Sequence, residues 1–476
     1  MNYNKEFSPK INDFEEYLNS FLNFEKLPQK NMFWLDTMEF FLNKLDNPHL
    51  FAKTVHIAGS KGKGSTSAMI SSILEEAGLK TGLYTSPHIV NFLERITENQ
   101  TFFTNEIYEK SSDELKNCVE KYKNELKRPV TWFELVTIFA FICFKNANCD
   151  CEVLETGLGG RLDATNICKP EISCISTIEL EHTEFLGDTL EKIAFEKGGI
   201  IKENTPVIIA KQIPSVKKVF KKISKEKHAP IFFIDEEFSS IKTEYFLSDS
   251  IKNQTACINS NTHSYVFNPV VKMKTTLESK IFSRPLTFSL SLLGEFQAQN
   301  AALASFAVKK AFPFITEEQI EKGLEKTILE GRLEIINNPE KFSGIPYLIL
   351  DGAHTPNSID FTLQTLNKLF GKNNSSSLKN FNLLFSCAKD KDIKDISVLL
   401  KKYFDFAFIT KPGNVKQSDL SSIKKSFEDC GIDYDCDEDF ILQIKKALTK
   451  SNENKSSLLV TGSFYLVSEV KKILNS

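Results

Sequence analysis

Short apolar runs alternate with stretches of helical periodicity along most of the chain. This alternation is typical of an α/β fold with a mainly parallel sheet, whose strands are buried on both faces. In the first part of the chain the predicted strands are Val55–Ala58, Glu152–Glu155, Ile172–Ile178, Val207–Ala210, Ile231–Ile234 and Thr287–Leu293, the last as part of a hairpin. The predicted helices there are Ser67–Ala77, Trp132–Phe144, Leu190–Ile200 and Gln297–Phe312, with Gly78 as a stop signal after the first.

A second α/β series follows in the last third of the chain. Its predicted strands are Tyr347–Leu350, Leu383–Ser386, Phe406–Ile409 and Leu458–Thr461, and its predicted helices are Asn357–Phe370, Ile393–Tyr403 and Phe464–Leu474. The segment 237–267 is polar and we expect it to be irregular, and we expect Gly371–Asn380 and Ser451–Ser457 to be surface loops.

The two series predict two domains, with a boundary near residues 328–333. We expect residues 1–328 to form a larger domain with a central, mostly parallel sheet, and residues 329–476 to form a smaller Rossmann-like α/β domain. Two such doubly wound units leave a cleft between them, which is a common place for a ligand.

Composition excludes several classes of protein. The 476 residues carry a net charge of -3, with 41% hydrophobic and 25% charged residues, so we expect a globular protein without a nucleic-acid surface. We see no signal peptide and no apolar stretch of about eighteen residues, and therefore expect a cytoplasmic protein without a membrane span. The ten cysteines form no Cys-x-x-Cys pair, so buried free thiols are favoured over zinc ligands.

The strand Val55–Ala58 runs into the glycine-rich segment Gly59, Ser60, Lys61, Gly62, Lys63, Gly64, Ser65 and Thr66. A strand, a glycine-rich turn and a helix are the arrangement in which backbone N–H groups curl around phosphate oxygens. Lys63 is placed to reach the β- and γ-phosphates, and the hydroxyl of Ser65 or Thr66 to reach a magnesium ion. The spacing departs from the usual Walker pattern, because only two residues separate Gly59 from Gly62. A lysine-bearing surface turn is the alternative interpretation, and the loop alone does not distinguish a kinase, a GTPase and a ligase.

Several further segments resemble the Mur ligase superfamily, and within it the folylpolyglutamate synthase branch. The phosphate loop HIAGSKGKGSTSAMI is similar to the ATP loop of that family, and the other similar segments follow in the family's order. They are Tyr84–His88 with Phe92–Ile96, Glu155–Asn166, His182–Thr183, Leu186–Gly187, Glu196–Ile200, Gly294–Gln297 with Asn300, Gly331–Arg332 with Glu334, Asp351–His354 and Thr461–Tyr465. The chain departs from the family pattern at Glu181 (usually Asp), Gly198 (Ala), Thr355 (Asn) and Ser60–Lys61 (Thr-Asn).

The resemblance implies an ATP-dependent ligase that adds L-glutamate to folates, and also to dihydropteroate, through an acyl phosphate. It implies a P-loop ATPase domain followed by a glutamate-ligase domain. Because the transferring phosphoryl group carries charge on several oxygens, such an enzyme needs fixed cations and backbone donors around it. The partners it implies are small molecules, with no nucleic acid and no membrane, and nothing demands more than a monomer.

The resemblance also implies roles for individual residues. Ser86, Glu155 and His182 would hold Mg²⁺, together with phosphates and waters. Lys197 would be a catalytic, carbamylated lysine, for which a desolvated amine with a lowered pKa is suited. The remaining implied roles are ATP contacts for Asn300, Arg332 and Asp351, a substrate-side catalytic role for His354, and substrate binding for Arg95, Asp163 and Ser463.

Simpler interpretations stay open for some of these residues. His182 alone would more often be a loop or core histidine, Lys197 a solvated helix lysine, and Arg332 a linker ion-pair residue. Glu155 stands apart because it ends an apolar strand at the carboxyl edge where such sheets bind ligands. Three other functions are weighed: a ligase of peptidoglycan precursors, a nucleotide-regulated binding protein without turnover, and a P-loop GTPase or kinase.

Overall fold

The chain divides into two compact units. The computed structural model describes residues 7–23, 35–88, 91–247, 271–371, 378, 380–389, 391–414 and 417–475. Unit 1 consists of Met1–Thr243, Thr275–Ser289 and Glu295–Thr327, and unit 2 of Glu244–Lys274, Leu290–Gly294 and Ile328–Ser476. The main cut therefore falls between Thr327 and Ile328.

Unit 1 is built on a seven-stranded sheet in the order β3-β2-β4-β1-β5-β6-β7. Its strands are β1 Lys53–Ala58, β2 Thr81–Tyr84, β3 Ile96–Glu98, β4 Cys151–Glu155, β5 Pro170–Ile175, β6 Val207–Ile209 and β7 Ile231–Phe233. Only β3 runs antiparallel to its neighbour, whereas β1 pairs in parallel with β4 and β5. The loops that follow β1, β4 and β5 therefore leave the same edge of the sheet, side by side.

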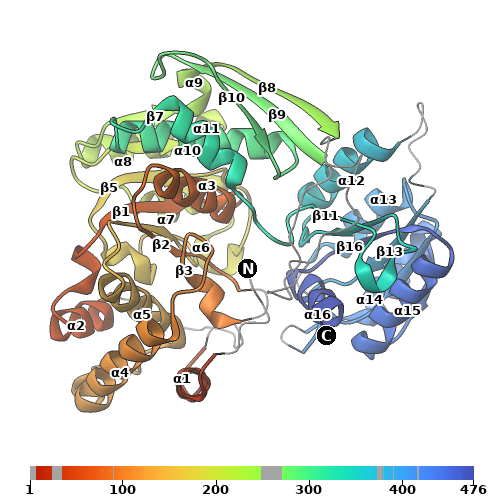
Figure 1. Cartoon of the computed structure of the whole chain (residues 1–476), viewed down its shortest axis with the longest axis horizontal. Coiled ribbons are helices and arrows are strands. Elements are labelled where there is room, and N and C mark those ends of the chain that lie inside the picture. Colours follow the sequence, from red (N-terminus) through yellow and green to blue (C-terminus); the bar gives the residue numbers. More distant parts are fainter. Residues whose placement is uncertain are drawn as a thin grey trace. The chain divides into compact units, whose positions relative to one another are not determined.

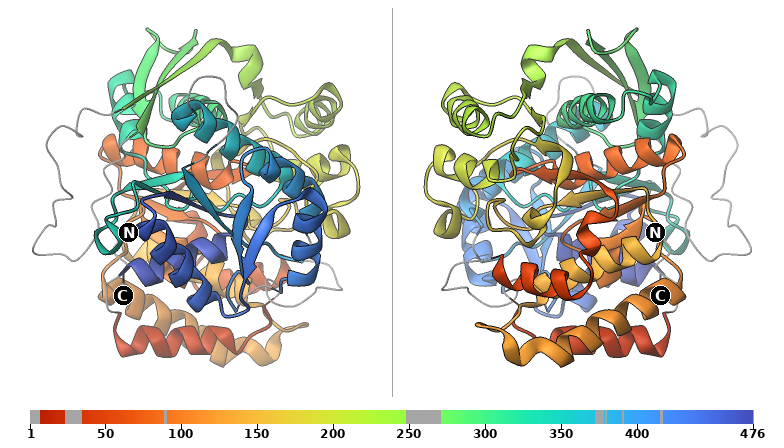
Figure 2. Two further views of the ribbon diagram at one scale, coloured as in Figure 1. Left: turned by 90° about the vertical axis from the view of Figure 1, so that its right-hand side faces the viewer. Right: turned by 90° about the vertical axis from the view of Figure 1, so that its left-hand side faces the viewer.

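Helices cover both faces of this sheet. In Figure 1, α3, α10 and α11 lie on one face and α4 and α5 on the other, and Figure 2 shows the same layers from the side. The helices of unit 1 are α1 Pro9–Asn19, α2 Asp36–Lys44, α3 Lys63–Glu76, α4 Asn105–Tyr122, α5 Trp132–Asn146, α6 Thr183–Leu186, α7 Leu190–Gly198, α8 Pro214–Glu226, α9 Ile234–Glu237, α10 Glu295–Ala311 and α11 Glu317–Lys326, with short 3-10 turns η1 Pro48–Leu50, η2 Phe92–Arg95, η3 Lys123–Glu125 and η4 Ala164–Ile167.

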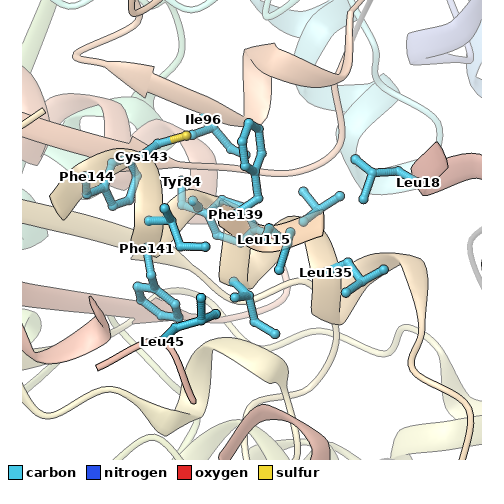
Figure 3. Packing of buried hydrophobic residues seen from close by; sticks show 14 of the residues in the cluster. Leu18, Leu45, Tyr84, Ile96, Leu115, Leu135, Phe139, Phe141, Cys143 and Phe144 are labelled. Atoms are coloured by element: carbon cyan, nitrogen blue, oxygen red, sulfur yellow. The ribbon is translucent and has the colours of Figure 1, made fainter. Parts of the chain in front are cut away.

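The core under α5 is rich in aromatic rings. Phe139 lies between Tyr84 and Leu115 in this cluster (Figure 3). The helix begins where the sequence predicts, because Thr131 caps it: its hydroxyl accepts from the Glu134 N–H, and the Glu134 carboxylate accepts from the Thr131 N–H at 2.9 Å.

Strands β8 Phe238–Leu247, β9 Val271–Ser279 and β10 Leu286–Leu290 form a three-stranded sheet in the order β10-β9-β8. The expectation of irregular structure over 237–267 is therefore wrong for the stretch that β8 occupies, and residues 248–267 lie outside the described residues. In β8 polar residues stand at exposed positions between partly buried ones, so the strand lacks the apolar run by which the other strands were recognised.

Unit 2 is a second α/β layer structure with its own six-stranded sheet, in the order β11-β12-β16-β13-β14-β15. Its elements are β11 Glu334–Asn337, η6 Glu340–Phe342, β12 Tyr347–Leu350, α12 Pro356–Phe370, β13 Phe381–Phe385, α13 Ile393–Lys401, β14 Phe406–Ile409, α14 Leu420–Cys430, β15 Asp433–Cys436, α15 Phe440–Glu453, β16 Ser457–Thr461 and α16 Phe464–Asn475. Leu348, Leu384 and Leu458 face α15 and α16, whereas Phe385 packs on Phe427 of α14, so both faces are buried.

The element predictions are confirmed for the fold class and wrong at some boundaries. Helix α3 begins at Lys63 rather than Ser67, because Gly62 with its positive φ of 87° turns the chain directly into the helix. Strand β5 ends at Ile175, three residues before the predicted end. The predicted loop Ser451–Ser457 is shorter than expected, since α15 continues to Glu453 and β16 begins at Ser457; most of the other predicted loop, Gly371–Asn380, lies outside the described residues.

Two further expectations concern membrane-spanning helices and the state of the cysteines. In the part of the chain that the structure describes, no helix has the length and apolar character needed to cross a membrane. The nine cysteines described are all free, and seven of them are buried; Cys257 lies outside the described residues.

The packing of α11 on α3 yields a stability prediction. A Cβ at Gly323 would lie 2.5 Å from the Cα of Ile73, so Gly323→Ala forces the two helices apart. The higher helix propensity of alanine contributes only about 1 kcal/mol, whereas overpacking costs about 1–3 kcal/mol. We expect a lower thermal midpoint, measured by circular dichroism.

The exposed neighbour Lys322 provides the control, because Lys322→Ala on the same helix should change stability by less than about 0.5 kcal/mol. An equal midpoint for Gly323→Ala and Lys322→Ala would contradict the close packing of α11 on α3.

Candidate active site

The loop between β1 and α3 requires glycine at two positions. Gly59 and Gly62 have φ angles of 144° and 87°. A Cβ would lie 1.9 Å from the Ser176 Oγ at Gly59, and 2.4 Å from the Asn300 Oδ1 at Gly62. The side chain of Asn300, on α10, therefore lies directly against the loop.

The first half of the loop is pinned to the segment after β5. The N–H groups of Ser60 and Lys61 donate to the carbonyl oxygen of Thr177 at 2.8 and 3.3 Å. The first helical hydrogen bond of α3 is made by the Thr66 N–H, which donates to the Gly62 carbonyl oxygen at 2.9 Å. The N–H groups of the preceding helical residues, 63–65, thus belong to the first turn, where a helix binds anions.

Two ammonium groups meet on one carbonyl oxygen at this loop. Lys63 Nζ donates to the Gly59 oxygen at 2.9 Å, and Lys197 Nζ, from α7, donates to the same oxygen at 2.7 Å. Lys197 Nζ also contacts Glu181 Oε1 at 2.8 Å, with the lysine side chain 2% exposed. Glu181 is attracted by Lys63 as well, so one carboxylate acts on both ammonium groups.

The pKa values follow from this arrangement. Burial, aided by repulsion from Lys63, lowers the pKa of Lys197 to about 8, against the attraction of Glu181. Burial would raise the pKa of Glu181, but Lys63 and Lys197 outweigh it and lower that pKa to about 2. Glu181 is therefore ionised at neutral pH, and Lys197 is mostly charged, with about a tenth of the amine neutral at pH 7.

Glu155 lies at the end of β4, next to the helix start. Its Oε2 accepts from the Ser86 N–H at 3.1 Å and would lie 3.4 Å from a Cβ at Gly64. His182, with a φ of 46°, directly precedes α6 on the loop after β5 and is one of the groups that lower the pKa of Glu181.

These groups suit a hard cation that is completed by phosphate and water. No three described His, Cys, Asp or Glu side chains gather into a ready-made metal cage. A buried carboxylate beside a phosphate loop is the donor set that Mg²⁺ uses when nucleotide phosphates and waters supply the other ligands. The chemistry of Glu155 and Ser86 therefore fits that ion.

Asp163 shapes the loop that follows β4. It is buried, and its carboxylate accepts from the N–H groups of Gly157 and Leu158 at 2.9 Å and from the Thr165 hydroxyl at 2.6 Å. Because that hydroxyl donates to Asp163, its oxygen accepts from His56 Nε2 at 2.8 Å. Burial raises the pKa of Asp163, against these hydrogen bonds.

Arg95 is a buried cation in unit 1. Its Nε donates to His88 Nδ1 at 2.9 Å, and its guanidinium carbon lies 4.9 Å from the centre of the Trp132 ring. The side chain is 1% exposed. It is therefore held rigidly between two aromatic side chains.

The predicted site residues of unit 2 gather where β12 and β16 end. The Arg332 guanidinium lies 4.0 Å from the Phe464 ring centre. His354 Nδ1 shares a 2.8 Å hydrogen bond with the Gly352 oxygen, and the Ser463 Oγ accepts from the Tyr465 N–H at 3.1 Å. Asp351 is buried, which raises its pKa against the attraction of Arg332, and it accepts from the Thr362 hydroxyl.

The structure thus brings the predicted residues into two groups. Unit 1 holds the phosphate loop with Ser86, Glu155, Lys197 and Asn300, and also His182, Asp163 and Arg95. Unit 2 holds Arg332, Asp351, His354 and Ser463. Sequence reasoning missed Glu181 as the partner of Lys197 and Thr177 as the acceptor that pins the loop. The only signal for Glu181 was a carboxylate directly before His182.

A parallel sheet whose central strand enters a cationic glycine loop defines a nucleotide-dependent α/β enzyme. Residues 57–308 match the model of the Mur ligase middle domain, and residues 331–464 match that of the Mur ligase glutamate ligase domain. A curated relative, the dihydrofolate synthase/folylpolyglutamate synthase of Bacillus subtilis, is 30% identical over 92% of this chain and 94% of its own.

Solved structures agree with this match. The folylpolyglutamate synthase of Thermotoga maritima has a TM-score of 0.77 at 28% identity, covering 98% of this chain and 96% of its own. The E. coli protein in complex with DHPP and ADP has a TM-score of 0.75 at 24% identity, covering 98% and 97%, and shows the same fold. The chain belongs to the Mur ligase family of ATP-dependent ligases, in its dihydrofolate synthase/folylpolyglutamate synthase branch.

The charge cluster predicts how stability depends on pH. The pKa of Glu181 falls from 4.5 to about 2 on folding, so its contribution is complete above pH 4.5 and is lost as the pH falls toward 2. We expect Glu181→Gln to lower the free energy of unfolding between pH 7 and pH 5, where Glu181 of the wild type is ionised. Below pH 4.5 the difference from the wild type should shrink, as measured by urea denaturation.

Glu184→Gln, at an exposed position on α6, should follow the wild type at every pH. A Glu181→Gln deficit that persists undiminished at pH 3 would argue against the ion pair with Lys197.

Proposed function

We propose that this enzyme adds L-glutamate to folates, and also to dihydropteroate, using ATP. The observation that carries the proposal is the pair of ammonium groups, Lys63 and Lys197, on the Gly59 carbonyl at the start of α3. The names of its relatives support the choice of substrate, since both glutamate-adding activities appear in the name of the Bacillus subtilis protein.

The proposed chemistry makes an amide from a carboxylate. A carboxylate oxygen of the folate or pteroate attacks the γ-phosphorus of ATP, and ADP leaves, which yields an acyl phosphate. The amine of glutamate then attacks the acyl carbon, loses a proton, and inorganic phosphate departs. Both steps move negative charge onto phosphate oxygens, so fixed cations and N–H donors lower their barriers.

Unit 1 would hold the triphosphate. We assign phosphate binding to Gly59, Ser60, Lys61, Gly62, Lys63, Gly64, Ser65 and Thr66. Lys63 would leave the Gly59 carbonyl for the phosphates, and Asn300 would contact the nucleotide beside Gly62. Ser86, Glu155 and His182 would hold Mg²⁺, which neutralises phosphate charge when bound.

Lys197 has the environment of a modifiable lysine. Its pKa of about 8 leaves a neutral fraction of the amine at physiological pH, and carbon dioxide reacts with neutral amines. We propose that Lys197 acts as a carbamylated catalytic residue. Release from Glu181 would accompany the loss of its positive charge.

Unit 2 would supply Arg332 and Asp351 to the nucleotide, His354 to the reacting substrates and Ser463 to glutamate. Arg95 and Asp163 of unit 1 are proposed to act on the pterin side; for Asp163 the buried hydrogen bonds favour an action through the loop Gly157–Asp163. We retain residues 1–328 as the ATP-binding domain and 329–476 as the glutamate-ligase domain, in a cytoplasmic monomer without nucleic-acid or membrane partners.

Phosphate release tests the function directly. With magnesium-ATP and glutamate, we expect release to depend on added dihydropteroate or tetrahydrofolate. Lys63→Ala should lower turnover at least 100-fold, because a charge at the transferring phosphoryl group is lost, a cost of about 2.7 kcal/mol or more. The exposed Lys53→Ala, on the same strand-to-helix segment, is the matched control.

Phosphate release with a UDP-muramoyl substrate instead would assign the chain to peptidoglycan synthesis. Near-normal turnover in a folded Lys63→Ala protein would refute the phosphate-loop assignment.

Magnesium titration tests the metal assignment. We expect Glu155→Gln and His182→Ala each to raise the Mg²⁺ concentration for half-maximal turnover about tenfold or more, because each loses a ligand. Glu184→Gln should titrate like the wild type. Superimposable curves for all four proteins would place the metal elsewhere.

A further inference from the structure

The segment of residues 330–334, at the start of unit 2, has a strained backbone around Arg332. Gly331 and Leu333, on either side of Arg332, have φ angles of 66° and 48°. Leucine rarely adopts the left-handed region, because its Cβ crowds the following carbonyl oxygen. Such a conformation persists only where the surroundings hold it, and it gathers at functional sites.

A buried lysine holds both ends of this segment. Lys471 of α16, with its side chain 8% exposed, contacts the carboxylates of Glu330 and Glu334, the latter at 3.0 Å. The same Glu334 oxygen accepts from the Gly331 N–H at 2.8 Å. One ammonium group thus ties together the residues on either side of the strained turn.

Further hydrogen bonds hold the centre of the segment. The Leu333 N–H donates to Asp351 Oδ1 at 3.4 Å, and the Gly352 N–H donates to the Gly331 oxygen at 2.9 Å. The turn that these bonds hold presents the Arg332 guanidinium to the Phe464 ring, 4.0 Å from its centre. Backbone and side chain of Arg332 are therefore both constrained.

Stability alone is a weak reason for this arrangement. A buried ion cluster gains little over apolar residues of the same size, because the charges must be desolvated. The left-handed Leu333 adds a further cost. Both costs fall on the residues that flank one arginine, which points to a need to hold that arginine in one direction.

We infer that Lys471 is a positioning residue for ligation: by clamping Glu330 and Glu334 it fixes the strained turn that presents Arg332 to the nucleotide phosphates. The inference rests on the proposed function of Arg332. A guanidinium held in advance in its binding direction loses less conformational entropy when a phosphate arrives.

A double-mutant cycle in steady-state turnover tests the coupling. Lys471→Met should lower kcat/KM for ATP at least tenfold, and Lys471→Arg should restore part of it. In an Arg332→Ala background, Lys471→Met should change kcat/KM less than twofold, because the residue it positions is gone. Lys472→Met is the matched control, since Lys472 is the next residue and its side chain is 47% exposed.

Equal losses from Lys471→Met in both backgrounds would overturn the inference, because the clamp would then act on something other than Arg332. The inference would also be overturned if a folded Lys471→Met protein kept the wild-type kcat/KM while the Arg332→Ala protein was impaired.

Arginine modification separates the inference from the proposed function. The rate at which phenylglyoxal modifies Arg332, followed by peptide mass spectrometry, should rise several-fold in Lys471→Met and stay unchanged in Lys472→Met. If Arg332→Ala leaves turnover intact, the phosphate role of Arg332 fails, and this rate alone decides whether Lys471 positions it. An unchanged rate overturns the inference.

A second variant covers the case in which Lys471→Met does not fold. Glu330→Gln removes one of the two carboxylates from the clamp and leaves Glu334 to pair with Lys471. For Glu330→Gln we expect a smaller loss of kcat/KM for ATP and a smaller rise in the rate of Arg332 modification than for Lys471→Met. A Glu330→Gln protein that matches the wild type in both measurements would count against the clamp.

Discussion

Two ammonium groups converge on one buried carbonyl oxygen in unit 1, and this contact constrains the whole phosphate-loop region. Two ammonium groups within hydrogen-bond distance of the same atom repel each other, and burial makes the repulsion stronger than in water. Glu181 compensates one of the charges, and the Gly59 dipole contributes to holding both. The glycine turn and the hydrogen bonds to Thr177 hold the backbone that carries this oxygen.

The loop departs from the usual phosphate-loop spacing, and its lysines differ in origin as well. In the common phosphate loop a single lysine comes from the loop itself. Here the loop carries Lys61 and Lys63, and α7 adds the buried Lys197 from a distant part of unit 1. The N–H groups of the first turn of α3 lie beside these lysines, where a helix favours an anion.

The sequence predicted the elements of this site well and its contacts poorly. Apolar runs identified β1, β4 and β5, and Glu155 was recognised because it ends such a run. The pair Lys197–Glu181 could not be predicted, since it joins a helix to a loop whose approach is decided by packing. Periodicity also missed the first turn of α3, where glycine and serine hide the helical pattern.

In unit 2, too, the sequence predicted the strands and helices but not the contacts between side chains. Strands β12, β13, β14 and β16 were predicted from short apolar runs, and the family resemblance drew attention to Arg332. Nothing in the sequence marks Leu333 as left-handed, because leucine has no preference for that region. Likewise Lys471 looks like either of the two adjacent lysines on an amphipathic helix, and only its burial between two carboxylates sets it apart.

One carbonyl oxygen at the end of unit 1 has a mechanical consequence. The Gly323 oxygen accepts from the Ser72 hydroxyl of α3 at 2.7 Å and from the Thr327 hydroxyl at 3.0 Å. The last residue of unit 1 before the main cut is thereby anchored to the helix that starts at the phosphate loop. The end of unit 1 is therefore held on α3, and the packing of α11 on α3 fixes the place from which the chain leaves this unit.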